Sequence, residues 1–176
     1  ATYIETITFV IESYVLSNIA NTQLYLIING SISEMKTVED AITSSGKRKN
    51  IKVFSKLSYN MLVTYYKSAK ALLIPIRPNK RDIARFPHKI GEYTASCKPI
   101  ISNNIGEVSQ YFEDNNNAFI ASEFNSLFFA EKIKYAISNS NVSTSIGKNG
   151  YMTGIKHFDY KANGKRLYKF LLNEIY

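Results

Sequence analysis

The residues best suited to chemistry lie together in segment 85–93, which reads RFPHKIGEY. Pro87 has a fixed φ and no N–H group, so it suits the first turn of a helix. A helix that begins there presents unpaired N–H groups and the positive end of its dipole, with His88 and Lys89 beside them. This arrangement predicts an anion site, and phosphate is the usual anion.

Glu92 stands three residues after Lys89 and four after His88. Side chains at these spacings are neighbours on the surface of a helix. The carboxylate is therefore placed to accept hydrogen bonds from a polar group over the helix start, and a sugar hydroxyl is the natural candidate. The alternative is an ordinary amphipathic helix whose charged residues are solvated and bind nothing.

The elements that position this segment follow from the hydrophobic pattern. Continuous apolar runs predict buried strands at 24–28, 51–54, 72–76, 99–101 and 117–121. A helical pattern is found at 3–19, 34–45, 59–69, 106–113, 126–139, 142–155 and 160–175, with Ser33, Ser58 and Asp159 as expected caps. Residues 77–86 are rich in Arg, Lys, Pro and Asn and are expected to form a loop.

Strands that alternate with helices predict an α/β fold, a Rossmann-like parallel sheet with helices on both faces. Residues 1–176 are expected to form one domain, because 176 residues suffice for a single core. Ligands bind such sheets at the carboxyl ends of the strands, where the strand order reverses. The loops after residues 54, 76 and 102 are expected to line that crevice.

The charge of the chain favours an anionic partner. Lys and Arg number 22 and Asp and Glu 14, which gives a net charge of +8. Nucleotide phosphates, nucleic acid and an acidic membrane surface are the candidates. The sequence lacks the glycine-aromatic signature of an RNA-recognition strand, so we expect no nucleic-acid partner.

Cysteine and histidine are too few for a disulfide framework or a zinc site. With one cysteine and two histidines we predict no intramolecular disulfide and no metal site. Cys97 is expected to be a small buried side chain near a helix end, not a nucleophile. No apolar run is long enough to span a bilayer, and Glu5 and Glu12 interrupt the first one, which argues against a signal peptide. A cytoplasmic location is therefore expected.

Three segments resemble family 4 glycosyltransferases of the GT-B fold. Residues 65–75 are similar to "YY-x-x-AD-x-x-x-x-P", residues 86–99 to "FP-x-K-x-x-EY-x-A-x-G-KP", and residues 105–117 to a "GE" followed by "DG-x-N". They occur in the family's order and spacing, and the resemblance covers nearly the whole chain. Enzymes of that family consist of two Rossmann-like domains that face a cleft, and this chain resembles only the carboxyl-terminal, donor-binding domain.

The resemblance implies roles for individual residues. Glu92 would hold the ribose hydroxyls of a nucleotide, and Ala84 stands where the family's first glutamate is expected. No basic residue occurs between positions 1 and 8, so Arg85 or Lys89 would stabilise the departing diphosphate in place of the family's arginine and lysine. The remaining donor-binding residues would be Phe86, Pro87, His88 and Lys89 at the diphosphate or sugar, and Ser55, Lys56 and Leu57 around the base.

The implied activity is transfer of a glycosyl group, of the hexosyltransferase type, from a nucleoside diphosphate sugar to a hydroxyl acceptor in polysaccharide or glycolipid synthesis. The sugar nucleotide is a substrate, and no cofactor or metal is expected. The family's acceptor domain and first strand have no counterpart in residues 1–176, so this chain alone should bind donor and hardly turn over.

Other functions stay open at this stage. One is a non-catalytic module that binds nucleotides or anionic polymers, and others are a nucleic-acid binder and a partner-docking domain. A further hypothesis is peripheral contact with the anionic inner face of a membrane through the basic residues of the last helix, which are Lys161, Lys165, Arg166 and Lys169.

Overall fold

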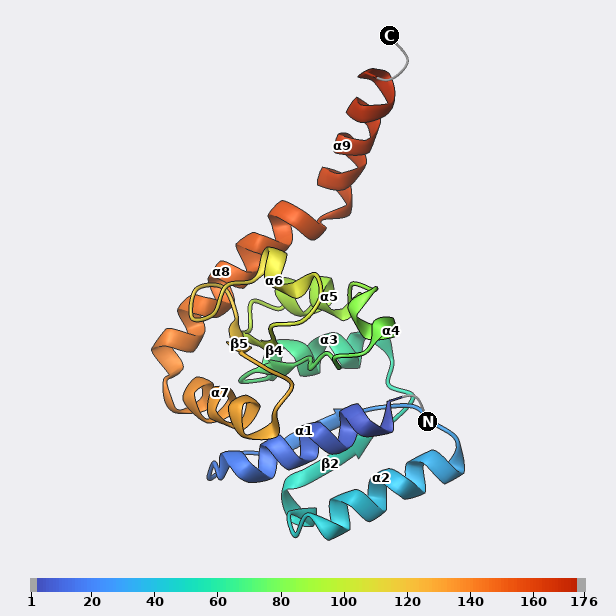
Figure 1. Cartoon of the computed structure of the whole chain (residues 1–176), viewed down its shortest axis with the longest axis vertical. Coiled ribbons are helices and arrows are strands. Elements are labelled where there is room, and N and C mark those ends of the chain that lie inside the picture. The colour runs from blue at the N-terminus through green and yellow to red at the C-terminus, as the bar shows by residue number, and fades with distance from the viewer. Residues whose placement is uncertain (1–2, 174–176) are drawn as a thin grey trace.

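The computed structural model describes residues 3–173, in which helices alternate with parallel strands (Figure 1). The order of elements agrees with the sequence prediction except for two additional short helices, the 3₁₀ turn η1 and the helix α4, which lies in the segment expected to be a loop. The strands are β1 (Leu24–Ile27), β2 (Ile51–Phe54), β3 (Leu72–Leu73), β4 (Ile100–Asn103) and β5 (Phe119–Ala121). The helices are α1 (Ile4–Ser17), α2 (Ile32–Ser44), the 3₁₀ turn η1 (Arg48–Asn50), α3 (Tyr59–Ser68), α4 (Lys80–Ile83), α5 (Lys89–Ala95), α6 (Val108–Tyr111), α7 (Ser126–Ser138), α8 (Ser140–Phe158) and α9 (Tyr160–Asn173).

The strands form two parallel sheets, whereas a single sheet was expected. One sheet has the order β1-β2 and the other β3-β4-β5. Within the described residues no strand pairing joins β1 to β3. Leu73 of β3 nevertheless packs against buried residues of both sheets, so a shared core connects them.

β3 is shorter than expected because side chains of β4 replace part of its pairing. Ser102 donates a hydrogen bond from its hydroxyl to the Ile74 carbonyl (2.9 Å). The buried amide of Asn103 accepts from the Ile76 N–H (2.7 Å) and donates to the Ile76 carbonyl (2.8 Å). These bonds fix the main chain where it leaves the sheet.

Both faces of the three-stranded sheet are covered. Successive residues of a strand point to opposite faces. Ile101 and Phe119 accordingly pack in a cluster with residues of α1, α7 and α8, whereas Ile100 and Ile120 pack with residues of α5 and α6. This two-sided burial explains why these strands read as continuous apolar runs.

Two helix starts test the cap predictions. Ser58 caps α3, as expected, because its hydroxyl accepts from the Met61 N–H (3.4 Å). The cap of α2 is Ser31, and the prediction of Ser33 was wrong. Ser31 accepts from the Glu34 N–H, and the Glu34 carboxylate accepts from the Ser31 N–H (2.7 Å), which is a capping box.

Cys97 differs from its prediction, because its side chain is exposed. It follows the last residues of α5 with a φ of 59°, in the left-handed region where helices commonly end and where glycine is favoured. The turn out of α5 therefore directs this side chain to solvent.

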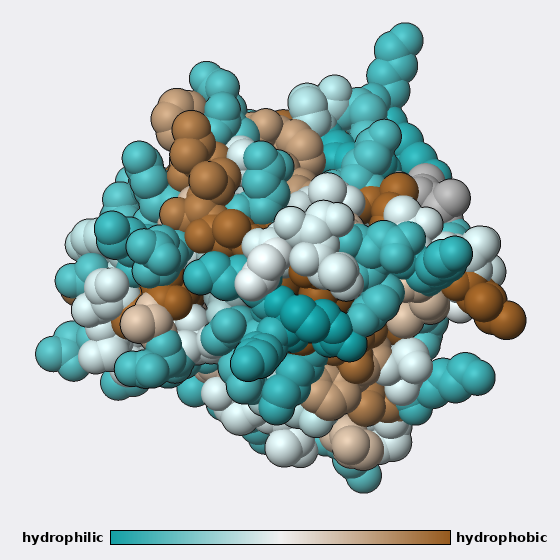
Figure 2. All heavy atoms as spheres, turned by 90° about the horizontal axis from the view of Figure 1, so that it is seen from below, coloured by the Kyte–Doolittle hydropathy of each residue, from teal (hydrophilic) through white to brown (hydrophobic). Residues whose placement is uncertain are grey.

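α9 projects from the rest of the molecule (Figure 1), and its main contacts are with α8. Asp159 caps it, as expected, by accepting from the Ala162 N–H (2.8 Å). Residues 174 and 175 of the predicted helix lie outside the described residues. The face of the molecule seen in Figure 2 is mostly polar, with apolar atoms in separate patches.

Candidate functional site

The turn that precedes α5 is built as the sequence predicted, although regular helix begins at Lys89. The Ile90 N–H donates to the Pro87 carbonyl (3.0 Å) and the Gly91 N–H to the His88 carbonyl (3.2 Å). His88 and Lys89 are exposed, and neither of their N–H groups donates to another described residue. Two main-chain donors at the helix start are thus open to solvent.

Packing behind α5 holds this turn in place. The Phe86 ring contacts the rings of Tyr111 and Phe158, with centroids 5.5 and 5.0 Å apart. Ile90 is fully buried in the core beneath the helix. Phe86 therefore anchors the segment to α6 and α8, and its ring serves packing in this structure.

Glu92 and Lys89 are exposed on α5, beside a tyrosine of α3. The Lys89 ammonium donates to the Tyr66 hydroxyl (3.3 Å). The Tyr66 ring, which is buried, packs edge-on against Tyr93 with a centroid distance of 5.0 Å. Burial, reinforced by the nearby Tyr93 and Glu92, raises the pKa of Tyr66 well above its ordinary value. The phenol therefore stays protonated.

The second predicted group, residues 55–57, follows β2. Ser55 and Lys56 are exposed and Leu57 is half-buried. Lys56 has a φ of 52°, and its N–H donates to the Asn29 side chain (3.0 Å), which joins the loops after β1 and β2. Among the described residues, no hydrogen bond, ion pair or ring contact links this loop directly to residues 86–92.

α3 lies between the two groups. Tyr65 packs on Phe54 of β2, with a ring distance of 5.0 Å, and on Tyr25 of β1, with a ring distance of 5.6 Å. The next residue, Tyr66, contacts Lys89. The helix thus connects the end of the β1-β2 sheet to the candidate anion site on α5.

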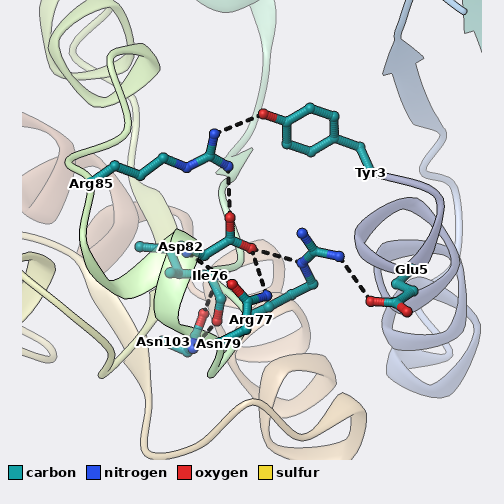
Figure 3. Close-up of polar contacts among 8 residues, drawn as sticks. All are labelled: Tyr3, Glu5, Ile76, Arg77, Asn79, Asp82, Arg85 and Asn103. Atoms are coloured by element: carbon teal, nitrogen blue, oxygen red, sulfur yellow. Dashed lines mark hydrogen bonds and ion pairs between the residues drawn. The ribbon is translucent and has the colours of Figure 1, made fainter. Parts of the chain in front are cut away.

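Arg85 belongs to a charged network that sequence reasoning did not find (Figure 3). Its guanidinium donates to the Asp82 carboxylate (2.8 Å) and to the Tyr3 hydroxyl (2.8 Å). Asp82 also accepts from Arg77 (2.7 Å), which in turn donates to Glu5 (2.8 Å). The network ties the loop after β3 to the start of α1.

The network is partly buried, and this sets its electrostatics. Burial alone would raise the pKa of Asp82, but hydrogen bonds from Arg77 and Asn79 and the charges of Arg77 and Arg85 hold it below its ordinary value. Asp82 is therefore ionised at neutral pH. Tyr3 and Glu5 lie more than 70 positions from their partners, and no local pattern could have indicated these contacts.

A cavity of about 270 Å³ lies beside this network. Tyr3 lines it, but Glu92 and residues 86–89 do not. It opens between α1, α2 and the chain after β1, and its lining consists of Tyr3, Ile4, Ile7, Ile28, Asn29, Gly30, Glu34, Met35 and Val38. The candidate anion site on α5 is therefore separate from this cavity.

Residues 3–173 contain neither a cluster of metal ligands nor a membrane-spanning helix. No group of three or more His, Cys, Asp or Glu side chains is arranged to hold a metal ion. No helix in that range combines the length and apolar character needed to cross a membrane.

Comparison with known families identifies the chain. Residues 5–153 match the family model of glycosyl transferases group 1. The chain belongs to this family. A comparison with curated protein sequences found no match.

Several solved structures share the fold. Sucrose-phosphate synthase from Thermosynechococcus elongatus matches with a TM-score of 0.76 at 18% identity, over 93% of this chain and 42% of that one. HepE from Anabaena, in complex with UDP, matches with a TM-score of 0.76 at 17% identity, over 93% and 44%. The C-terminal domain of a group 1 glycosyl transferase (LpcC) from Francisella tularensis matches with a TM-score of 0.73 at 18% identity, over 91% and 82%. The chain thus spans less than half of the first two proteins and most of an isolated C-terminal domain.

Proposed function

We propose that this chain is the donor-binding domain of a glycosyltransferase and that it binds a nucleoside diphosphate sugar at the start of α5. The observation that carries the proposal is the exposed pair Lys89 and Glu92 beside two open main-chain N–H groups. The Lys89 ammonium and the two N–H groups bind the diphosphate. The Glu92 carboxylate, one turn later, accepts hydrogen bonds from the ribose hydroxyls. HepE, which has the same fold, was crystallised with UDP and with UDP-glucose, and this supports a sugar nucleotide as the ligand.

The chemistry asked of the site is stabilisation of the departing diphosphate. As the bond to the sugar breaks, negative charge grows on the leaving phosphate oxygen. Preorganised N–H donors and the Lys89 ammonium would face that charge in a fixed geometry. The Tyr66 hydroxyl holds the ammonium near the helix start, which limits the reorganisation needed during the reaction.

The acceptor belongs to another part of the enzyme under this proposal. The chain spans 42% of the sucrose-phosphate synthase chain and 44% of the HepE chain. We propose that a second domain binds the hydroxyl acceptor, that a hexosyl group is transferred, and that the 176-residue chain alone binds donor with little turnover. Synthesis of a polysaccharide or glycolipid remains the proposed role.

Titration calorimetry of the 176-residue chain with UDP, GDP and their sugars tests the proposal. We expect one nucleotide to bind and Glu92→Ala to weaken it about tenfold, since a hydrogen bond to a charged group is worth about 1.5–3 kcal/mol. Glu131→Ala on α7 and Lys148→Ala on α8 are matched controls at exposed positions. Absence of binding at millimolar nucleotide, or equal affinity for Glu92→Ala and wild type, would overturn the proposal.

A further inference from the structure

Arg85 has a side chain that is held at two points and remains open on its outer side. Its guanidinium donates to Tyr3 through one terminal nitrogen and to Asp82 through the other. The side chain is nevertheless 42% exposed. A guanidinium has five N–H donors in one rigid plane, so donors beyond these two bonds remain for a ligand.

The two partners are themselves fixed. The Asp82 side chain is 6% exposed and also accepts from Arg77 (2.7 Å) and Asn79 (3.2 Å). The Asn79 side chain accepts from the Asp82 N–H (2.9 Å) and caps α4. Tyr3 directly precedes α1, and the Arg85 guanidinium carbon lies 5.4 Å from the centre of its ring. Arg85 is thus directed by two elements that are far apart in the sequence.

Arg85 also lies next to the candidate anion site. His88 stands three positions after it in the sequence, so the two Cα atoms are at most about 11 Å apart. The ammonium of Lys89, the other cation of this segment, contacts only Tyr66 among the described residues. Arg85 differs in that two bonds set the plane of its donors, which matches the geometry of phosphate oxygens.

We infer that Asp82 and Tyr3 are positioning residues that hold the Arg85 guanidinium as a diphosphate-binding group of the donor site. This inference rests on the proposed function. Glu5, Arg77, Asp82 and Arg85 together carry no net charge, so the network contributes orientation instead of excess positive charge. An arginine released from it would keep its charge and lose its fixed direction.

UDP titration of the 176-residue chain tests the inference through a double-mutant cycle. Arg85→Ala is expected to weaken UDP binding about tenfold, as for loss of a charge-assisted hydrogen bond. Asp82→Asn and Tyr3→Phe are expected to weaken it by smaller factors. If both act through Arg85, the double variant Asp82→Asn/Arg85→Ala binds UDP no more weakly than Arg85→Ala alone.

The controls separate positioning from folding. Tyr3→Phe removes only a hydroxyl at a half-exposed residue, so it serves if Asp82→Asn does not fold. Glu39→Gln on α2 removes an exposed ion pair with Arg48 of η1 and should leave UDP affinity unchanged. Wild-type affinity for both Asp82→Asn and Tyr3→Phe, or additive losses in the double variant, would overturn the inference while the proposed function stands. A wild-type chain that binds no nucleotide overturns both.

Discussion

At the scale of single residues, the tyrosines behind α5 shape the candidate site. Tyr93 packs against Tyr66. Burial, and to a lesser extent the charge of Glu92, raises the pKa of Tyr93 to about 12. Two protonated phenols therefore stand behind a lysine and a glutamate that face solvent. This arrangement keeps negative charge off the inner side of the anion site.

The raised pKa of Tyr93 predicts a loss of stability in base. An unfolded tyrosine has a pKa near 10, so the folded chain binds this proton more tightly than the unfolded chain does. The resulting stabilisation is complete below about pH 10 and is lost as the pH rises toward 12. Urea unfolding at pH 9, 10 and 11 should show a smaller decline for Tyr93→Phe than for wild type, with Tyr135→Phe on α7 as the control. An equal decline in wild type and Tyr93→Phe would contradict this.

At the scale of elements, α8 sets the position of α5. Three glycines of α8 lie against the site helix and neighbouring turns. A Cβ at Gly147 would lie 2.6 Å from the Cys97 carbonyl, one at Gly150 2.8 Å from the Asn117 carbonyl, and one at Gly154 2.4 Å from the Thr94 hydroxyl. Because these positions carry no side chain, α8 can pack closely against α5 and the turns beside it.

Gly147→Ala is therefore expected to destabilise the chain. The added methyl group meets main-chain atoms that cannot rotate away, and overpacking of this kind costs about 1–3 kcal/mol. Gly164→Ala is the matched control, since nothing lies within 4 Å of its Cβ on the exposed helix α9. There the substitution should leave stability unchanged or raise it, because alanine favours helix. Thermal unfolding of the two variants compares them, and a Gly147→Ala melting temperature equal to wild type would refute the packing argument.

The elements themselves were largely predictable. β2 has the predicted bounds, and α3 and α7 lie within one residue of theirs, because apolar periodicity and caps are local signals. α4 was missed, since four residues capped by Asn79 carry no periodicity. The truncation of β3 depends on Ser102 and Asn103, whose side-chain bonds span 27 or 28 positions. Such contacts are set by tertiary structure and leave no pattern in the sequence.

The placement of some candidate site residues was predictable. His88, Lys89 and Glu92 are exposed at the start of α5, as their spacing indicated. The network around Asp82 was not predicted, because it joins two regions that only the fold brings together. Whether these residues bind donor stays a prediction for the titrations described above.

At the scale of the whole molecule, α9 packs little, and none of its described residues is buried. Its large apolar side chains, Leu167, Tyr168 and Phe170, are 59%, 64% and 59% exposed. Segments with few buried contacts open locally at low cost in free energy. Limited trypsin digestion should therefore cleave first within α9, at Lys161, Lys165, Arg166 or Lys169. Mass spectrometry of the early fragments identifies the cut, and a first cut before residue 159 would contradict the expectation.

The exposed Cys97 has a practical consequence for experiments on this molecule. It is the one cysteine of the sequence, and it lies two positions beyond α5. A maleimide fluorophore or a nitroxide spin label could therefore be attached there to the natural sequence, without engineering a handle. Such a reporter would follow movements at the end of α5 while nucleotide is titrated against the candidate site at the start of that helix.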